Sequence, residues 1–359
     1  MRVLITGANG MVGQALERSL TAEGHQVNCL VRRPRLQRVA PPPQSQDYAW
    51  DPDKGIIDPD ALKGLDGVIH LAGANIAQGR WTSRRKQQLR SSRVEATTFL
   101  VKALRNASNL PDFFFTASAI GIYGDQSDRE IVETHPAADD FLGSLGQDWE
   151  KASAVMEQDG VRVVALRLGM VLSSHGGALA TMLPAFRWGL GAILGSGSQY
   201  VSWVSLEDVV GCVHFLLEQP RLRGPINVTA PDPVTFKTFA HTLGGVLHRP
   251  VWMRIPSMGV RLLFGEMGQA VLLSSCRVLP QRLLDHGFVF RHDSLPSALN
   301  ACINKRNQGH SKRRPGSPDA FAMNNDLNRQ KVKIVRISVR SPDQRPRSSS
   351  SPGTASWTS

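Results

Sequence analysis

The chain has 359 residues, 41% of them hydrophobic, so it is long enough to bury a sizeable core, and we expect one α/β domain with a smaller lobe. No apolar run reaches bilayer-spanning length, and four widely separated cysteines argue against a zinc site or a disulfide framework. A formal net charge of +12 would indicate a nucleic-acid partner if it were spread along the chain.

The excess positive charge is instead concentrated in residues 305–359. This segment has twelve Lys or Arg against three Asp and is rich in Ser and Pro. Its apolar content is too low for independent folding, so we expect a disordered basic tail. The alternative is an arm for an anionic partner, with weak nucleic-acid binding through the tail alone.

Strands and helices alternate along the first two thirds of the chain. Residues 2–6 predict a buried strand, residues 11–23 have helical spacing, and a second strand begins at Gln26. Further elements are predicted as strands at 67–73, 112–119 and 161–172 and as one helix from an N-cap at Thr82 to Leu104. This order predicts a doubly wound, Rossmann-type parallel sheet.

We therefore divide the chain into three regions. Residues 1–235 form a nucleotide-binding domain with part of the substrate lobe interposed, residues 236–304 a mainly helical C-terminal domain, and residues 305–359 the tail.

The stretch TGANGMVG carries the clearest functional signal. Gly7, Gly10 and Gly13 lie between the first strand and the first helix, where absent side chains let backbone N–H groups approach a pyrophosphate. The strand before, the helix after and the second strand about twenty residues on supply the context that this motif requires.

The end of the second strand indicates which dinucleotide is bound. A site for NAD would place Asp or Glu there, whereas this chain has Arg32 and Arg33. A guanidinium pairs with a 2′-phosphate, so the sequence favours NADP(H). The alternative is that these arginines are solvated in a loop beside Pro34.

Several motifs in order resemble the extended and atypical short-chain dehydrogenase/reductases. They are TGANGMVG, DGVIHLAG, SAIGIYGDQ, LRLGMVL and WVSLEDVV. HLAGANI, SRVEATTFLVKAL, DWEKA, LGSGSQYVSWV and FGEMGQAVLLSSCRVLPQRLLDHGFVF look more narrowly like the subgroup called epimerase family proteins, over roughly residues 1–300.

The resemblance implies bound NADP(H) and a set of residues that hold it. These are Thr6, Gly7, Asn9, Gly10, Met11, Val12 and Gly13, then Arg32 and Arg33, then His70, Leu71, Ala72 and Gly73. Ser118 matches the superfamily's active-site serine, and could hydrogen-bond a substrate oxygen or its own backbone.

The superfamily's proton-transferring Tyr and Lys, four residues apart, are missing. None of the three tyrosines has a lysine four residues later, and Leu142 and Gly146 fall where the pair is expected. Arg93 likewise replaces an expected asparagine. Tyr123 is the first candidate substitute, ahead of Asp125, Glu133 and Lys151, although an aromatic there also suits packing.

The substrate side is less clear. RWTSRRKQQLRSSR begins a basic helix, and Arg187 and Trp188 precede a Gly-rich loop. These cations either attract an acidic substrate or form a solvated helix face.

Two functions stay open. One is an NADP(H)-binding oxidoreductase or epimerase-like enzyme that transfers hydride to an unidentified small molecule without the Tyr–Lys pair. The other is a non-catalytic nucleotide-binding regulator, which the resemblance links to cell or plastid division. We expect a cytoplasmic or plastid stromal protein with no metal and no membrane partner; oligomeric state is open.

Overall fold

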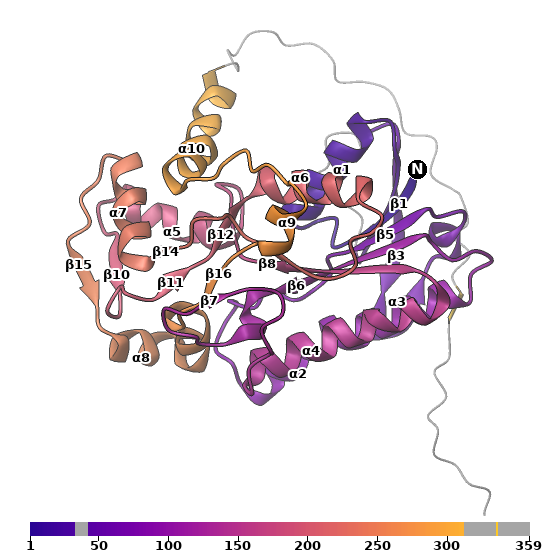
Figure 1. The fold of residues 1–359 in the computed structure, drawn as a ribbon, viewed down its shortest axis with the longest axis horizontal. Coiled ribbons are helices and arrows are strands. Elements are labelled where there is room, and N and C mark those ends of the chain that lie inside the picture. The colour runs from indigo at the N-terminus through magenta and orange to yellow at the C-terminus, as the bar shows by residue number, and fades with distance from the viewer. Residues whose placement is uncertain (33–41, 312–334, 337–359) are drawn as a thin grey trace, which may run out of the picture.

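The computed structural model describes residues 1–32, 42–311 and 335–336 (Figure 1). Its centre is a sheet with the strand order β13-β8-β6-β5-β1-β2-β3-β4-β17. The strands from β13 to β3 are parallel and form the expected doubly wound sheet, while β4 and β17 are antiparallel. Their bounds are β1 Arg2–Thr6, β2 Gln26–Val31, β3 Ser45–Asp51, β4 Ile56–Ile57, β5 Gly67–His70, β6 Phe113–Ala119, β8 Arg162–Leu168, β13 Gly224–Val228 and β17 Val335–Arg336.

Helices cover both faces of this sheet because its strands bury apolar side chains on both sides. One face packs against α1 (Met11–Ala22) and α6 (Leu206–Glu218). The other packs against α3 (Ala96–Arg105), with α4 (Phe141–Ala154) beside it. Figure 1 shows these two layers above and below the strands.

The helix predicted from Thr82 to Leu104 is continuous but not uniform. Thr82 is its N-cap, as expected, because its side chain accepts a hydrogen bond from the Arg85 N–H. The helix consists of α2 (Ser83–Arg90), a π-helical turn over Ser91–Glu95, and α3. π-Turns of this kind are frequent at functional sites.

The strand predicted over residues 161–172 is two strands. β8 ends at Leu168, and β9 (Met170–Leu172) leaves the main sheet to pair with β12 (Trp203–Ser205). A Cβ on Gly169 would lie 2.7 Å from the Ser202 carbonyl oxygen, so only glycine fits at this break. The prediction of one strand was wrong because an apolar run does not reveal which partner each half pairs with.

A smaller lobe follows β8. Its core packs α5 (Gly177–Arg187), α7 (Phe236–Val246) and the first part of α10 (Leu295–Ser311) around Trp203 and Phe239. The other elements after β8 are β10 Ala192–Leu194, β11 Tyr200–Val201, β14 Val234–Thr235, β15 Met253–Ile255, α8 Ser257–Met267, β16 Arg277–Val278 and α9 Gln281–Asp285. β16 pairs with β7 (Glu130–Ile131), which precedes β8 in the chain.

The tail expected from residue 305 falls almost entirely outside the described residues. Helical backbone continues to Ser311, past the boundary expected at residue 304, and Val335–Arg336 pairs with β4. This pairing of Val335 and Arg336 was not indicated by the sequence alone. Within the described residues, no helix is both long enough and apolar enough to cross a bilayer.

Replacing Gly67 with Ala is expected to lower the free energy of unfolding by about 1–3 kcal/mol. A Cβ there would lie 1.9 Å from Cζ of Phe113, whose ring is held 4.7 Å from that of Phe115 and cannot move freely. Denaturant unfolding measures the loss. Gly245→Ala is the control, since it lies in α7 with open space around it, and should gain about 0.5–1 kcal/mol. Equal behaviour of the two variants would contradict this account of the core.

Candidate functional site

The glycine turn lies where the strand order of the sheet reverses. Connections from β1 run outward to β2 on one side, while β5 lies on the other, so the carboxyl ends of β1 and β5 border the point where ligands bind in such sheets. The β1–α1 turn and the residues after His70 meet there.

Each of the three glycines is required by a close backbone approach. Gly7 has a φ of 68°, and a Cβ on it would lie 2.7 Å from the carbonyl carbon of Leu71. A Cβ on Gly13 would lie 2.5 Å from the Gly7 oxygen, and one on Gly10 3.1 Å from the same atom. The turn is therefore packed directly against the HLAG segment and the start of α1.

The N-terminus of α1 is open toward an anion. Gly10 is its N-cap and has no side chain to bond the free N–H groups of the first turn, which contains no acidic residue. Of the other residues that the sequence assigned to the cofactor, Asn9 is exposed and accepts from Gln14 through its backbone oxygen, Met11 contacts the loop at Gly176, and Val12 packs on the core.

A buried hydrogen-bond chain fixes the HLAG segment against this turn. Thr6 Oγ1 accepts from the N–H groups of Leu71 and Ala72, each at 3.1 Å, so its own proton points to His70 Nδ1 at 2.7 Å. His70 Nε2 then donates to Thr97 Oγ1 at 3.0 Å, and Thr97 donates to the Arg93 carbonyl at 2.6 Å. The donor and acceptor roles of Thr6 at one end and of Thr97 at the other therefore fix the direction of these hydrogen bonds.

His70 is consequently neutral, with its proton on Nε2. Burial lowers the pKa of His70 to about 3, which agrees with the acceptor role of Nδ1. Thr6 and His70 therefore use their polar side-chain atoms to fix the backbone of Leu71 and Ala72 against the glycine turn.

Arg32 stands at the end of β2, as the sequence indicated. Its guanidinium pairs with Asp53 at 3.2 Å, with about half of each side chain exposed. An exposed ion pair of this kind contributes little stability, so Arg32 can leave Asp53 for an anion of higher charge. Arg33 lies outside the described residues.

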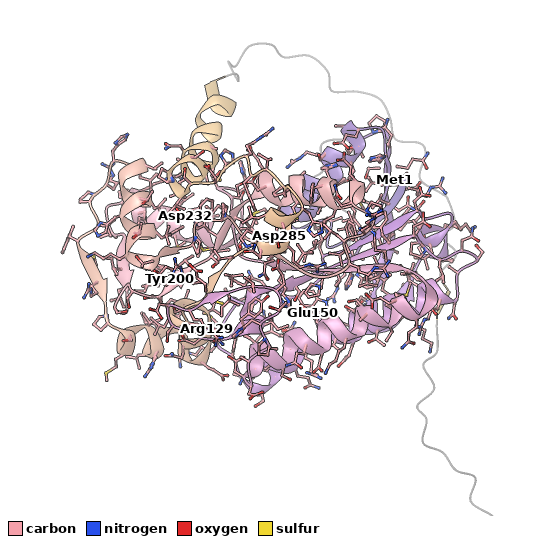
Figure 2. The ribbon with its side chains drawn as sticks, viewed as in Figure 1. Met1, Arg129, Glu150, Tyr200, Asp232 and Asp285 are labelled. Carbon is pink, nitrogen blue, oxygen red and sulfur yellow. The ribbon has the colours of Figure 1, made fainter. Side chains whose placement is uncertain are left out.

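Three polar residues stand side by side where adjacent strands end. Ser118 on β6 is in register with Arg167 on β8, and Arg167 is in register with Asn227 on β13, so the three side chains share one face of the sheet. Glu150 of α4 lies against this face of the sheet, and Figure 2 labels it beside α4.

Glu150 holds this row together. It accepts two hydrogen bonds from Arg167, both at 2.8 Å, and one from Ser118 Oγ at 2.6 Å. Although burial opposes the charge, the bonds to Glu150 raise the pKa of Arg167 above its usual range. The Ser118 hydroxyl thus donates its proton to a hydrogen bond with the Glu150 carboxylate, while the lone pairs of its oxygen stay able to accept.

Tyr123 is bound into the same network from the other side. Its hydroxyl donates to Asn227 Oδ1 at 2.7 Å and accepts from Arg167 at 2.8 Å, and the side chain is fully buried. Burial raises the pKa of Tyr123 to about 12. A phenol with this pKa and these partners links strands and does not suit proton transfer near neutral pH.

The positions expected for the Tyr–Lys pair are occupied by packing. Leu142 of α4 lies 3.2 Å from where a Cβ on Gly121 would be, and a Cβ on Gly146 would lie 2.9 Å from Cβ of Ile122. Helix α4 therefore sits directly against residues 120–123. A lysine at position 146 would have no room without moving that segment.

Arg93 occupies the π-helical turn and reaches back to the HLAG segment. Its Nη2 donates to the Ala74 carbonyl at 3.0 Å, and its guanidinium lies 5.1 Å from the Trp149 ring and 3.3 Å from where a Cβ on Gly73 would be. Burial, followed by repulsion from Arg85, lowers the pKa of Arg93 to about 10. It remains charged, and no carboxylate of the described chain pairs with it.

The other cations of the basic helix are largely engaged. Arg80 donates to the Leu262 carbonyl, Lys86 pairs with Glu266 at 2.6 Å, and Arg90 pairs with Asp148. Arg80, just before α2, and Lys86 within it therefore connect this helix to α8, so these two cations do not belong to a solvated face.

Glu133 is the buried acid that the sequence ranked low. Its Oε1 accepts from the N–H of Asn227 and of Arg282, whereas Oε2 has no hydrogen-bond partner among the described residues. Burial raises the pKa of Glu133. Asp125 is exposed and bonds the Ser127 N–H, and Lys151 is exposed on α4.

Sequence reasoning missed the roles of Arg167 and Asn227. Both are polar residues inside otherwise apolar strands, and such a buried charge requires a partner, which was the available signal.

Comparisons with known proteins show the family and the fold. The family model "NAD dependent epimerase/dehydratase family" matches residues 3–229, and a domain of unknown function, DUF1731, matches residues 255–302. An epimerase family protein of Mycobacterium bovis is 42% identical over 314 residues, covering 88% of this chain and 98% of that protein. A chloroplastic Arabidopsis thaliana homologue of epimerase family protein SDR39U1 is 33% identical over 312 residues, covering 84% and 87%.

A solved structure extends the comparison. Human epimerase family protein SDR39U1, crystallised with NADPH, superposes with a TM-score of 0.75 at 33% identity, covering 85% of this chain and 99% of that one.

Glu133→Gln is expected to stabilise the protein increasingly as pH rises. Because the folded-state pKa of Glu133 is raised, the native chain loses stability as pH rises from the ordinary carboxyl pKa to the raised value. Gln stays neutral over this range, so the variant does not lose that stability. The difference in free energy of unfolding between variant and native chain should therefore grow over that window and then level off. Denaturant unfolding across a pH series measures it, with exposed Glu157→Gln as control. A difference that does not change with pH would contradict the argument.

Proposed function

Because the chain belongs to the NAD dependent epimerase/dehydratase family, we propose that it binds NADP(H) and transfers hydride to or from a small molecule without a Tyr–Lys pair. The observation that carries the proposal is the turn of Gly7, Gly10 and Gly13 at an uncapped helix N-terminus. Backbone N–H groups and the helix dipole there suit a pyrophosphate. Leu71, Ala72 and Gly73 complete the binding surface, and residues 236–304 complete the substrate side.

The preference for NADP(H) over NAD(H) rests on Arg32. Residues 32 and 33, which follow β2, are not acidic, so neither offers a carboxylate to a ribose 2′-hydroxyl. A 2′-phosphate would compete with Asp53 for the guanidinium of Arg32. The similar human protein crystallised with NADPH supports the same choice.

Ser118 and Arg93 are the groups we assign to the chemistry. Both are held by consecutive residues of α4, Ser118 through Glu150 and Arg93 through Trp149. Bound NADPH supplies hydride, and a carbonyl oxygen that gains negative charge requires positive charge or N–H and O–H donors. Arg93 provides the charge beside Gly73. Ser118 turns its hydroxyl proton from Glu150 to the oxygen and so orients it, while Glu150 stays paired with Arg167, and the final proton comes from water. Lacking a positioned acid, this reaction is slower by about 10²–10⁴ than one with the pair.

One observation favours a second function, a nucleotide-binding regulator that performs no reaction. The places of the Tyr–Lys pair are filled by Leu142 against Gly121 and by Gly146 against Ile122, and Tyr123 is locked. A protein that keeps the glycine turn but fills the place of the proton-transferring residues with packed side chains could bind a nucleotide without reacting with it, as a sensor does.

Arg32→Asp is expected to weaken NADPH binding about tenfold to a hundredfold, the worth of charge-assisted hydrogen bonds to phosphate, while NADH binding stays unchanged or improves. Nicotinamide fluorescence during titration of the full chain measures both. Arg129→Asp, an equal charge change on an exposed residue away from the turn, should leave NADPH binding intact. Failure of the native chain to bind either dinucleotide would overturn the cofactor proposal.

Turnover separates the two functions. We expect oxidation of NADPH with aldehydes or ketones that carry a carboxylate or phosphate, and a loss of about 10²–10³ in kcat for Ser118→Ala. Ser144→Ala, which changes an exposed serine on α4, is the control. NADPH binding without oxidation across this panel, in both native chain and Ser118→Ala, would support the regulator instead.

A further inference from the structure

Two segments of the small lobe contain no acidic residue. Neither 176–206 nor 233–265 has an Asp or Glu, although together they have five Lys or Arg: Arg187, Lys237, Arg249, Arg254 and Arg261. Along the chain, Glu207 directly follows the first segment, and Asp232 and Glu266 flank the second. Glu207 is paired with His292 and Glu266 with Lys86.

The two segments form one end of the molecule. β10 of the first pairs with β15 of the second, aligning Ala192 with Met253, and Arg249 Nε donates to the Arg187 carbonyl at 2.9 Å. Helix α8 starts directly after β15. Figure 1 shows β10, β15, α7 and α8 together at the end of the molecule opposite β1–β3.

Large apolar side chains project from this end into solvent. Trp188 is 82% exposed, Trp252 75%, Met258 81% and Leu262 74%, and Leu190 and Leu263 are exposed as well. Trp252 directly precedes β15 and Arg254 lies within it, two residues on; on α8, Met258 and Leu262 are one turn apart. We call Trp188, Leu190, Trp252, Arg254, Met258 and Leu262 the end patch.

We propose that the end patch docks this protein on an anionic lipid bilayer, with Trp188 and Trp252 in the headgroup region. Indoles and flexible apolar side chains favour the membrane interface, and nearby cations with no acid among them are attracted to anionic headgroups. The side chains project separately from three elements, which a deformable bilayer accommodates and a rigid protein surface would have to match one by one.

This docking is compatible with the absence of a spanning helix in the described part of the chain, because a peripheral contact needs none. It is independent of hydride transfer, so either proposal can fail alone. The expectation of no membrane partner rested on the absence of a bilayer-spanning apolar run, and a surface contact of this kind does not require such a run.

The test uses the full chain with vesicles of phosphatidylcholine, with and without phosphatidylglycerol. We expect binding to the anionic vesicles only. Trp188→Ala with Trp252→Ala should weaken it at least about tenfold, since each apolar side chain contributes more than 1 kcal/mol. Arg254→Gln should weaken it about fivefold, corresponding to about 1 kcal/mol per cation at the surface. Val289→Ser, which removes an 85% exposed apolar residue outside the end patch, is the control.

Every variant retains the basic residues 305–359, so differences between variants report the end patch and not the tail. Brominated lipids add a direct readout, because they quench only inserted indoles. Quenching should survive Trp357→Phe and fall for Trp188→Phe and Trp252→Phe. The proposal is overturned if the native chain does not bind, if the double Ala variant binds as well as the native chain, or if quenching depends on Trp357. It is also overturned if the native chain self-associates and the double variant does not, which makes the end patch a contact between copies.

Discussion

The ion pair between Glu150 and Arg167 is the interaction on which the centre of this protein depends. It joins α4 to β8, its carboxylate accepts a hydrogen bond from Ser118, and its guanidinium donates to the hydroxyl of Tyr123. Removing one partner of a buried pair leaves an uncompensated charge and costs about 3–5 kcal/mol. Because Tyr123 also bonds Asn227, whose side-chain amide donates to the Leu279 carbonyl, the network runs from the sheet into the C-terminal part of the chain.

The nucleotide turn is fixed by a different device, a neutral chain from Thr6 through His70 and Thr97 to the Arg93 carbonyl. A charged group would be expensive at so dry a position, and the low pKa of His70 removes that cost. The same chain ends on the π-helical turn that carries Arg93. The backbone of HLAG and the guanidinium of Arg93 are therefore positioned together, which would place a positive charge beside whatever the turn holds.

The small lobe carries a contrast in surface chemistry. Where the basic helix meets α8 and α4, the cations are matched: Lys86 pairs with Glu266 of α8 and Arg90 with Asp148 of α4. At the far end, Arg254 and Lys237 are exposed in segments without acids, beside Trp188 and Trp252. Cations that bridge elements stabilise the fold, whereas cations without nearby acids create a field that acts on a partner.

The sequence by itself determined the nucleotide turn, the order of strands and helices in the first domain, the Thr82 cap and the absence of the Tyr–Lys pair, because each depends on residues close together in the chain. Only the tertiary structure decided which polar groups are available. Tyr123 was a catalytic candidate until strand register brought Arg167 and Asn227 onto its hydroxyl, and α4 brought Glu150 to Ser118. The break at Gly169 and the end patch likewise join segments distant in sequence. Hydrogen bonding and burial depend on such long-range neighbours, and local patterns contain no information about them.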